Sequence, residues 1–321
     1  MKKVGGKLLI GLLIIVVVLA VYTYWDNNRI TIARQEITID DLPEQFEGFE
    51  ILQITDLHEK VFGKNQKSLI DAINSINYDA IVFTGDMLDG VESTNYKYFY
   101  TLIDGINNKE HAWYVPGNAD PESYQVNQTV EKSEFIQGME KRGVTFLENF
   151  DTISVDGKSL RFVNFELSIG NVGIPNGIPK PSYAANRQYL SYQKELMQEL
   201  KNIEEADTLI ALNHYPVVDP RIDHILDSPN LEMPDYDLLM AGHYHGGQIR
   251  LPLIGALFVP EAWYDNGGFF PPQDRVKGLW EYKVLKQYVS TGLGSSDAIS
   301  FLKFRLFNPP QINVLSLKRG N

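Results

Sequence analysis

The sequence predicts an α/β fold, with strands and helices arranged in layers, and an apolar helix at its amino terminus. Two observations lead to this prediction. From residue 50 onward, short apolar runs typical of buried strands alternate with segments whose apolar residues recur at helical spacing. Ahead of them lies an uncharged run that is long enough to cross a membrane. The composition of the 321 residues, 44% hydrophobic and 22% charged, excludes wholesale disorder.

The charge and the cysteine content exclude several classes of function. The net charge is −12, and a nucleic-acid backbone repels an acidic chain, so we expect no nucleic-acid partner. The chain has no cysteine, which excludes a disulfide framework, a thiolate zinc site and cysteine catalysis. Any metal ion must therefore be held by histidine, aspartate, glutamate or asparagine side chains.

The first 25 residues differ from the rest of the chain. Residues 1–7 carry three lysines and no acid, and residues 8–25 read LLIGLLIIVVVLAVYTYW, with three aromatic residues close to the end. Interfacial aromatics and cytoplasmic lysines are typical of a single-pass anchor in the cell membrane. We therefore expect a cytoplasmic amino terminus and an extracytoplasmic remainder. The alternative is a cleaved signal peptide, but its apolar region is usually shorter and ends in a small-x-small site, which we do not find.

The remaining elements follow in order along the chain. Apolar runs predict strands at residues 50–55, 79–84, 111–116, 152–155, 160–165, 207–213 and 236–241. Helical spacing predicts helices at residues 65–76, 129–142 and 188–203, with a Gly/Pro-rich loop at 171–181. Beyond residue 251 the helical signals fade, and strands are predicted at residues 282–285, 288–291 and 312–317. We expect three parts: 1–25 as cytoplasmic head and transmembrane anchor, 26–49 as a connecting segment and first strand region, and 50–321 as one large domain.

Potential metal ligands follow five of the predicted strands, at the point where each strand ends. In chain order the clusters are Asp56-Leu57-His58, Gly85-Asp86, Gly117-Asn118-Ala119-Asp120, Asn213-His214 and Gly242-His243-Tyr244-His245. Each cluster alone has an ordinary explanation as a turn, a cap or a hydrogen-bonded side chain. Ligands of open α/β sheets gather at the carboxyl ends of strands, so we expect the five clusters to converge on one site.

This combination of imidazole and carboxylate side chains indicates a two-metal hydrolase. Such ligands suit Mn²⁺, Fe, Zn²⁺ or Ni²⁺, whereas an all-oxygen set would suit Mg²⁺ or Ca²⁺. Two ions about 3.5–4 Å apart can clamp a phosphoryl group and lower the pKa of water, which supplies a nucleophile at neutral pH. A carboxylate is the natural bridge between two cations, and Asp86, which stands alone after its strand, is the candidate.

These motifs resemble the ordered motifs of the calcineurin-like metallophosphoesterases over about residues 50–250. The tail is similar to a membrane-anchored bacterial branch of that family at residues 246–252, 278–279, 290–294 and 305–310. The resemblance implies that residues 50–321 form a four-layer α/β/β/α sandwich with the site at the mouth of its central sheets.

The resemblance also implies two divalent metal ions, with manganese as the first candidate. It assigns one ion to Asp56, His58, Asp86 and His245, and the other to Asp86, Asn118, His214 and His243. It further implies that Asp86, Asn118 and His214 are catalytic residues.

One position departs from the family pattern. The family commonly has histidine after the Gly-Asn pair, where it contacts the phosphate and can protonate the leaving group, but this chain has Ala119. General acid catalysis contributes about 10²–10⁴-fold in rate. Its loss favours substrates whose leaving groups need little protonation, such as phosphodiesters and pyrophosphates. Asp120 is an alternative donor, although a nearby metal pair favours its ionised form.

We therefore expect a metal-dependent phosphoesterase that cleaves phosphodiester or pyrophosphate bonds. The apolar and aromatic residues 252–272 allow two interpretations. We favour ordinary core and strand; the other is an apolar wall that accepts the tail of a lipid-linked substrate. The alternative function is a metal-binding module that lost turnover together with the histidine at position 119.

Overall fold

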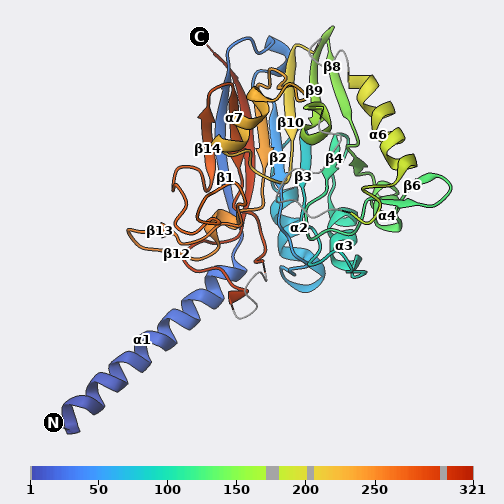
Figure 1. Cartoon of the computed structure of the whole chain (residues 1–321). Helices are drawn as coiled ribbons and strands as arrows, with labels where there is room; N and C mark the ends of the chain where they lie inside the picture. The colour runs from blue at the N-terminus through green and yellow to red at the C-terminus, as the bar shows by residue number, and fades with distance from the viewer. Residues whose placement is uncertain (1, 171–180, 201–205, 297–301, 321) are drawn as a thin grey trace.

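Two six-stranded sheets, stacked face to face, form the centre of the protein, and helices cover their outer faces (Figure 1). The computed structural model describes residues 2–170, 181–200, 206–296 and 302–320. One core of apolar side chains lies between the two sheets. A further core lies between the first sheet and its helices, and another lies between the second sheet and its helices. The predicted α/β/β/α sandwich is therefore confirmed.

The first sheet contains the strands that precede three of the five ligand clusters. In spatial order its strands are β1 (Thr31–Ile39), β16 (Gln311–Arg319), β2 (Glu50–Ile54), β3 (Ala80–Thr84), β4 (Ala112–Val115) and β7 (Thr145–Phe146). β2, β3, β4 and β7 run parallel, whereas β16 is antiparallel to β2 and parallel to β1. Ile54 lies opposite Phe83, and Phe83 opposite Tyr114, so these strands end at the same edge of the sheet.

The second sheet supplies the other two clusters. Its strands are β14 (Gly278–Tyr282), β15 (Leu285–Val289), β11 (Leu238–Ala241), β10 (Thr208–Leu212), β9 (Lys158–Asn164) and β8 (Phe150–Val155). The four central strands run parallel, and β14 and β8 are antiparallel at the two edges. β10 and β11 are buried throughout, as expected of apolar runs covered on both faces.

Helices from two parts of the chain cover the two sheets. The first sheet is covered by α2 (Lys67–Asn74), α3 (Lys97–Gly105) and α4 (Glu134–Glu140), and the second by α5 (Phe165–Ser168), α6 (Arg187–Glu199) and α7 (Asp219–Asp227). Leu69 and Ile73 of α2 and Ile222 of α7 are buried in the respective cores. The predicted helices 65–76 and 188–203 correspond to α2 and α6. Residues 171–180 of the predicted loop and 201–203 of the second helix lie outside the described residues.

Two sequence predictions of secondary structure are wrong in part. The first residues of the predicted helix 129–142 form β6 (Val130–Lys132) instead, which pairs with β5 (Tyr124–Val126) in a hairpin. Helix α4 begins only after Ser133, which caps it by accepting from the Ile136 N–H. The predicted strand 282–285 is the turn between β14 and β15, where Lys283 has a φ of 51°. Helices α3 and α7 were not predicted.

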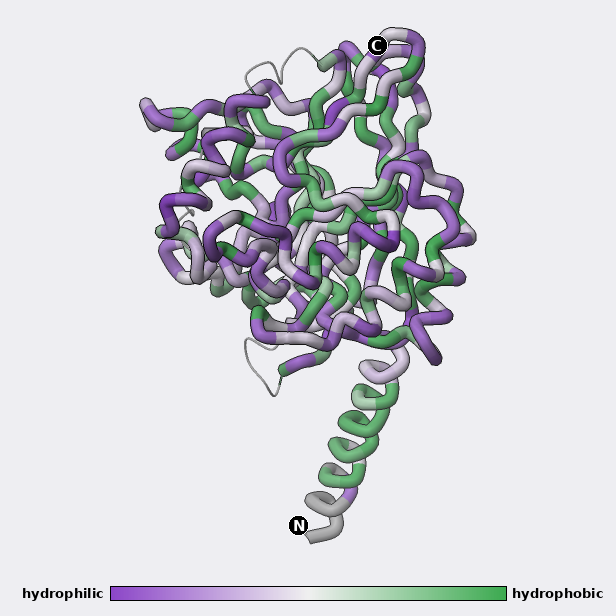
Figure 2. The backbone as a smooth tube through the Cα atoms, turned by 90° about the vertical axis from the view of Figure 1, so that its right-hand side faces the viewer, coloured by the Kyte–Doolittle hydropathy of each residue, from purple (hydrophilic) through white to green (hydrophobic). Residues whose placement is uncertain are grey.

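α1 (Lys2–Asn28) projects from the sandwich, and Figure 2 shows that it is apolar along most of its length. Its residues Leu9–Asn28 are long and apolar enough to cross a membrane, by length and composition, and are almost wholly exposed. The carboxyl end of the helix is held by Asn27, whose Nδ2 donates to the Arg305 carbonyl (2.6 Å) and whose Oδ1 accepts from the Arg305 N–H (2.8 Å). Lys60 Nζ donates to the carbonyl of Asn27 (2.6 Å).

Candidate metal centre

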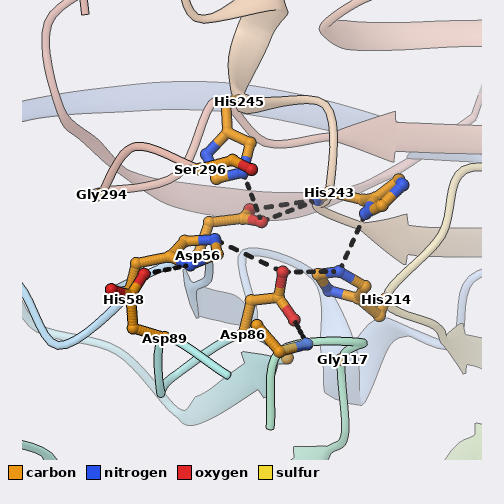
Figure 3. Close-up of polar contacts among 12 residues, drawn as sticks. Asp56, His58, Asp86, Asp89, Gly117, His214, His243, His245, Gly294 and Ser296 are labelled. Atoms are coloured by element: carbon orange, nitrogen blue, oxygen red, sulfur yellow. Dashed lines mark hydrogen bonds and ion pairs between the residues drawn. The ribbon is translucent and has the colours of Figure 1, made fainter. Parts of the chain in front are cut away.

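The structure brings six of the predicted ligands together at the carboxyl ends of the parallel strands (Figure 3). Their potential ligand atoms lie within 4.8 Å of one another in each of two buried groups. One group is Asp56, His58, Asp86 and His245, and the other is Asp86, His214 and His243. Asp86 belongs to both groups, which is the position that a bridging carboxylate requires.

The distances around Asp86 show how close the two groups are. Its Oδ2 atom lies 3.4 Å from His58 Nε2 and 3.3 Å from His214 Nε2. His214 Nε2 is in turn 3.1 Å from Nδ1 of His243. On the other side, His245 Nε2 lies 3.6 Å from Oδ1 of Asp56. The imidazole and carboxylate groups therefore face one shared space rather than separate surfaces.

The backbone at the strand ends is shaped to turn these side chains inward. Five of the six residues have φ in the left-handed region: Asp56 (52°), His58 (48°), Asp86 (56°), His243 (70°) and His245 (50°). Residues other than glycine adopt this region at a steric cost, and such strain is concentrated at functional sites. Glycines let the loops approach closely, because a Cβ on Gly117 would lie 2.2 Å from Asp86 Oδ1 and one on Gly242 2.1 Å from Thr55 Oγ1.

Hydrogen bonds fix the orientation of the candidate ligands. Asp86 Oδ1 accepts from the N–H of Ala119 (2.7 Å), and both Asp56 oxygens accept from the N–H of His243 (3.1 Å). One ring nitrogen of His214 faces the carbonyl of Thr84 (2.8 Å), and one of His243 faces the carbonyl of Pro260 (3.0 Å). Each ring therefore keeps its other nitrogen toward the cluster, the arrangement that backbone carbonyls give to metal-binding histidines.

In the cluster, burial and ion pairing shift the pKa values in opposite directions. Burial alone would raise the pKa of Asp86, but the nearby imidazoles of His214 and His58 outweigh it and hold that pKa well below its usual range. Burial would lower the pKa values of these two histidines, yet their ion pairs with Asp86 raise them to about 10 for His58 and about 9 for His214. Burial lowers the pKa of His243 to about 3 and raises that of Asp56 to about 6.

Several buried polar atoms in the cluster fit divalent ions. Asn118 Oδ1 and His245 Nδ1 have no hydrogen-bond partner among the described residues. Leaving such atoms unpaired is costly unless a ligand or ion binds them. The donor set mixes imidazole nitrogen with carboxylate and amide oxygen, which suits Mn²⁺, Fe, Zn²⁺ or Ni²⁺. The residues present therefore fit a pair of such ions, and the side-chain oxygen of Asn118 is a further candidate ligand.

The position of Ala119 leaves no side-chain donor in the family's usual place, and Asp120 does not replace it. The two oxygens of Asp120 accept from three backbone N–H groups, those of Asp86 (2.7 Å), Leu88 (2.9 Å) and Gly117 (2.9 Å). Burial raises the pKa of this carboxyl group. Asp120 thus fastens the loops after β3 and β4 to each other, and its oxygens are occupied by that role.

Two contributors to the site were missed from the sequence. Asp89 lies with Oδ1 3.3 Å from His58 Nδ1, and its signal was a second acid three residues after Asp86. Arg305 is fully buried, and its guanidinium donates to the carbonyls of His245 (3.0 Å), Thr291 (2.7 Å) and Gly294 (2.6 Å). It lies in the tail that carries the family resemblance, but no spacing rule connects it with the metal ligands.

A pocket of about 380 Å³ opens beside the cluster, between the ends of the two sheets. Asn118, Asn213 and Tyr215 line the side next to the candidate ligands. Aromatic side chains, Tyr124, Phe146, Tyr183 and Tyr189, line the rest together with several acids. Of the described residues that line it, none is a lysine or arginine.

The apolar segment 252–272 agrees with neither interpretation completely. Ala256 and Val259 are fully buried in a small core, as the favoured interpretation requires. Leu253, Ile254 and Phe270, by contrast, are exposed, and residues 252–272 are absent from the lining of the pocket described above.

The chain belongs to the calcineurin-like phosphoesterase family, whose sequence model matches residues 49–247, more than half of the chain. The uncharacterized metallophosphoesterase YkuE of Bacillus subtilis is 26% identical to it, over 93% of this chain and 89% of that protein. The UDP-2,3-diacylglucosamine pyrophosphatase LpxG of Chlamydia muridarum is 24% identical, over 85% of this chain and 86% of that protein. A transmembrane protein with a metallophosphoesterase domain from Danio rerio is 22% identical, over 78% of this chain and 53% of that protein.

Membership in this family makes the protein a metal-dependent hydrolase of phosphoric esters. The predicted family and class of reaction are confirmed, and the buried cluster of candidate ligands agrees with the dependence on metal.

Proposed function

We propose that the protein hydrolyses phosphodiester or pyrophosphate bonds with two divalent metal ions that share Asp86. The observation that carries this proposal is the pair of buried ligand groups around one carboxylate. One ion is assigned to Asp56, His58, Asp86 and His245, and the other to Asp86, Asn118, His214 and His243. Two such ions supply a nucleophile by lowering the pKa of water, and they neutralise the phosphoryl oxygens. Manganese is the first candidate.

The roles of Asp86, Asn118 and His214 follow from their contacts. One oxygen of Asp86 is held by the N–H of Ala119, which leaves the other, Oδ2, between His58 and His214. The Thr84 carbonyl fixes the ring of His214 with Nε2 toward Asp86. Asn118 offers a buried oxygen without a partner among the described residues. These three residues are therefore placed to hold the ions, which would in turn bind the phosphoryl oxygens.

The preference for diesters rests on Ala119 and on the pocket. No side chain at position 119 can protonate a departing alkoxide, so good leaving groups are favoured. The tyrosines that line the pocket favour a substrate with a ring-containing group that packs on them.

A membrane-linked substrate is supported by the position of α1. Lys60, two residues after His58, donates to Asn27 at the end of α1, and Arg305 contacts both Asn27 and the carbonyl of His245. The candidate centre therefore lies at the end of the sandwich from which α1 projects. The relative LpxG is named for a pyrophosphatase activity on a diacylated sugar nucleotide. We propose lipid-linked phosphoesters as the substrate class.

The proposed location is the cell membrane, crossed once by the anchor in residues 1–25, with residues 26–49 and the catalytic domain 50–321 outside. Protease added to intact cells should digest the domain and leave the lysine-bearing residues 1–7 protected. Recovery of the intact chain in the cytosolic fraction would contradict the anchor.

The test of the proposed activity uses the full chain, purified in detergent, with bis-p-nitrophenyl phosphate and added Mn²⁺. We expect turnover that a chelator abolishes and that Mn²⁺ restores. The second candidate function, a metal-binding module without turnover, is favoured only by Ala119. Tight binding of two ions without turnover of this activated diester would establish that module and contradict the proposed activity.

A further inference from the structure

A short hairpin beside α1 exposes apolar side chains to solvent. Its strands are β12 (Arg250–Leu251) and β13 (Gly255–Ala256), and the turn between them carries Leu253, which is fully exposed, and Ile254, which is 53% exposed. Figure 1 shows the hairpin on the side of the sandwich from which α1 projects. Phe307 lines the same shallow groove as residues 250–255. We call Leu253, Ile254 and Phe307 the membrane-contact face.

The backbone under this face is in an unfavourable conformation. Leu253 has a φ of 69° and Phe307 a φ of 52°, both in the left-handed region. Large apolar residues rarely adopt that region, and glycine or asparagine is usual there. Packing of such a side chain in a core can offset the backbone strain. Leu253, however, is fully exposed, and Phe307 is 38% exposed. The strain at Leu253 is therefore unexplained by packing among the described residues and points to a partner outside the chain.

The face is continuous with the apolar helix. The ring of Phe307 lies 5.4 Å from the ring of Tyr22 in α1, centre to centre. The two hydrogen bonds between Asn27 and Arg305 hold the end of α1 against the segment that contains Phe307. A bilayer that surrounds α1 up to its aromatic end would therefore meet Phe307 first and the hairpin next to it. The three side chains of the face are apolar and uncharged, so their own contact with lipid would come from apolar burial.

We propose that the membrane-contact face inserts into the interfacial layer of the lipid bilayer beside α1. This inference rests on the proposed anchoring and deepens the proposed function, because it holds the candidate metal centre at the level of the lipid headgroups. The partner is the bilayer itself. Aliphatic and aromatic side chains on a turn bind at this depth by burying apolar area, in the same way as interfacial helices.

The absence of cysteine allows a direct test with single reporters in the full chain. Leu253→Cys and Ile254→Cys are labelled with the fluorophore NBD, and the protein is reconstituted into phosphatidylcholine vesicles that contain a lipid with a nitroxide near its headgroup. The matched control is Val284→Cys, in the turn between β14 and β15 at the opposite end of the sheet, because Val284 is 51% exposed and Ile254 53%.

We expect the nitroxide to quench the labels at positions 253 and 254 at least about threefold more strongly than the label at 284. Equal quenching at the three positions would overturn the proposal, whether water or another protein covers the face. Val17→Cys, near the middle of α1, reports the anchoring separately, in vesicles whose nitroxide is carried on the lipid acyl chain. Quenching at 17 without quenching at 253 contradicts the face alone, whereas no quenching at 17 contradicts the anchor on which the inference rests.

A second variant separates membrane contact from folding. Asparagine tolerates the left-handed region, so Leu253→Asn should leave the thermal unfolding temperature in detergent unchanged or raise it. In vesicles the same substitution should reduce quenching of a label at 254 by about half or more, because apolar area is lost from the turn. A lower unfolding temperature with unchanged quenching would mean that Leu253 serves the domain and not the bilayer.

Discussion

Residues with a left-handed backbone occur in loops at both ends of the parallel strands. Those that follow the carboxyl ends are buried, whereas those in the turns before the amino ends are exposed. At the carboxyl ends, Asp56, Asp86 and His243 have φ of 52°, 56° and 70° and are buried. At the amino ends, Asp156 (49°) and Lys283 (51°) adopt the same conformation in exposed turns before β9 and β15. Left-handed geometry costs about 1–2 kcal/mol per residue. In exposed polar residues such as Asp156 and Lys283 it marks an ordinary turn, whereas combined with buried, unpaired polar atoms it marks a site.

The largest expected effect is on turnover and metal content, and it is tested by changing one aspartate at each end of the strands. Asp86→Asn should lower turnover of bis-p-nitrophenyl phosphate by about 10³-fold or more and reduce bound Mn²⁺, because a neutral amide cannot bridge two cations. Asp156→Asn makes the same chemical change in an exposed turn and should change neither quantity. The measurement is steady-state kinetics with metal analysis on both variants. Full activity and full metal content in Asp86→Asn would remove the bridging role.

A buried arginine and an exposed arginine should likewise differ in how much they contribute to the free energy of unfolding. Arg305→Met leaves three or more carbonyls around the His245 loop without their donor, and losing such a buried network should lower the free energy of unfolding by about 3–5 kcal/mol. Arg34 is exposed on β1 and pairs with Glu50 at 3.1 Å. Arg34→Met should lower the free energy of unfolding by less than about 1 kcal/mol. Chemical denaturation of both variants tests this, and similar losses would contradict the structural role of Arg305.

The dependence of metal binding on pH follows from the shifted histidines. Despite burial, Asp86 and its neighbours raise the pKa of His58 to about 10 and that of His214 to about 9, so both rings are protonated at pH 7 without metal. Metal needs the neutral ring, so each ion must displace a proton. Apparent Mn²⁺ affinity should fall about tenfold per site for each pH unit between 8 and 6. Calorimetry in buffers of different ionisation enthalpy should detect the released protons. If Mn²⁺ binding releases no proton, the raised pKa values of His58 and His214 are wrong.

The smallest expected effect concerns Ala119. Ala119→His should raise the rate on alkyl phosphate monoesters by about tenfold, below the full range for a positioned acid because the pocket is not tuned for it. Turnover of the activated diester, whose leaving group needs no proton, should change much less. A leaving-group series on both proteins measures this. Equal slopes of log rate against leaving-group pKa would show that another group donates the proton.

Much of the fold and the ligand set could be predicted because both depend on local signals. Buried parallel strands are mostly apolar, so β2, β3, β10 and β11 could be seen as apolar runs. The polar residues directly after them were then expected to share one edge of their sheet. The predictions failed where tertiary contacts decide. The strands of the hairpin before Ser133 have only three residues each, too few for a clear period of two.

Arg305 and Leu253 show a different limit of the sequence. The partners of Arg305 are backbone carbonyls of distant loops, and a carbonyl carries no sequence signal. Leu253 looked like part of an apolar core, because composition does not reveal whether a side chain faces inward or out of a turn. In both cases the information lies in the backbone path, which the sequence pattern leaves undetermined.

The central claim is that two metal ions share the carboxylate of Asp86. The most direct measurement is electron paramagnetic resonance of the full chain titrated with Mn²⁺, together with the number of ions bound. The account predicts two ions per chain and a spectrum of two spin-coupled Mn²⁺ ions, which reverts to isolated Mn²⁺ in Asp86→Asn but not in Asp156→Asn. A single ion per chain, or two ions with no coupling in the unchanged protein, would contradict it.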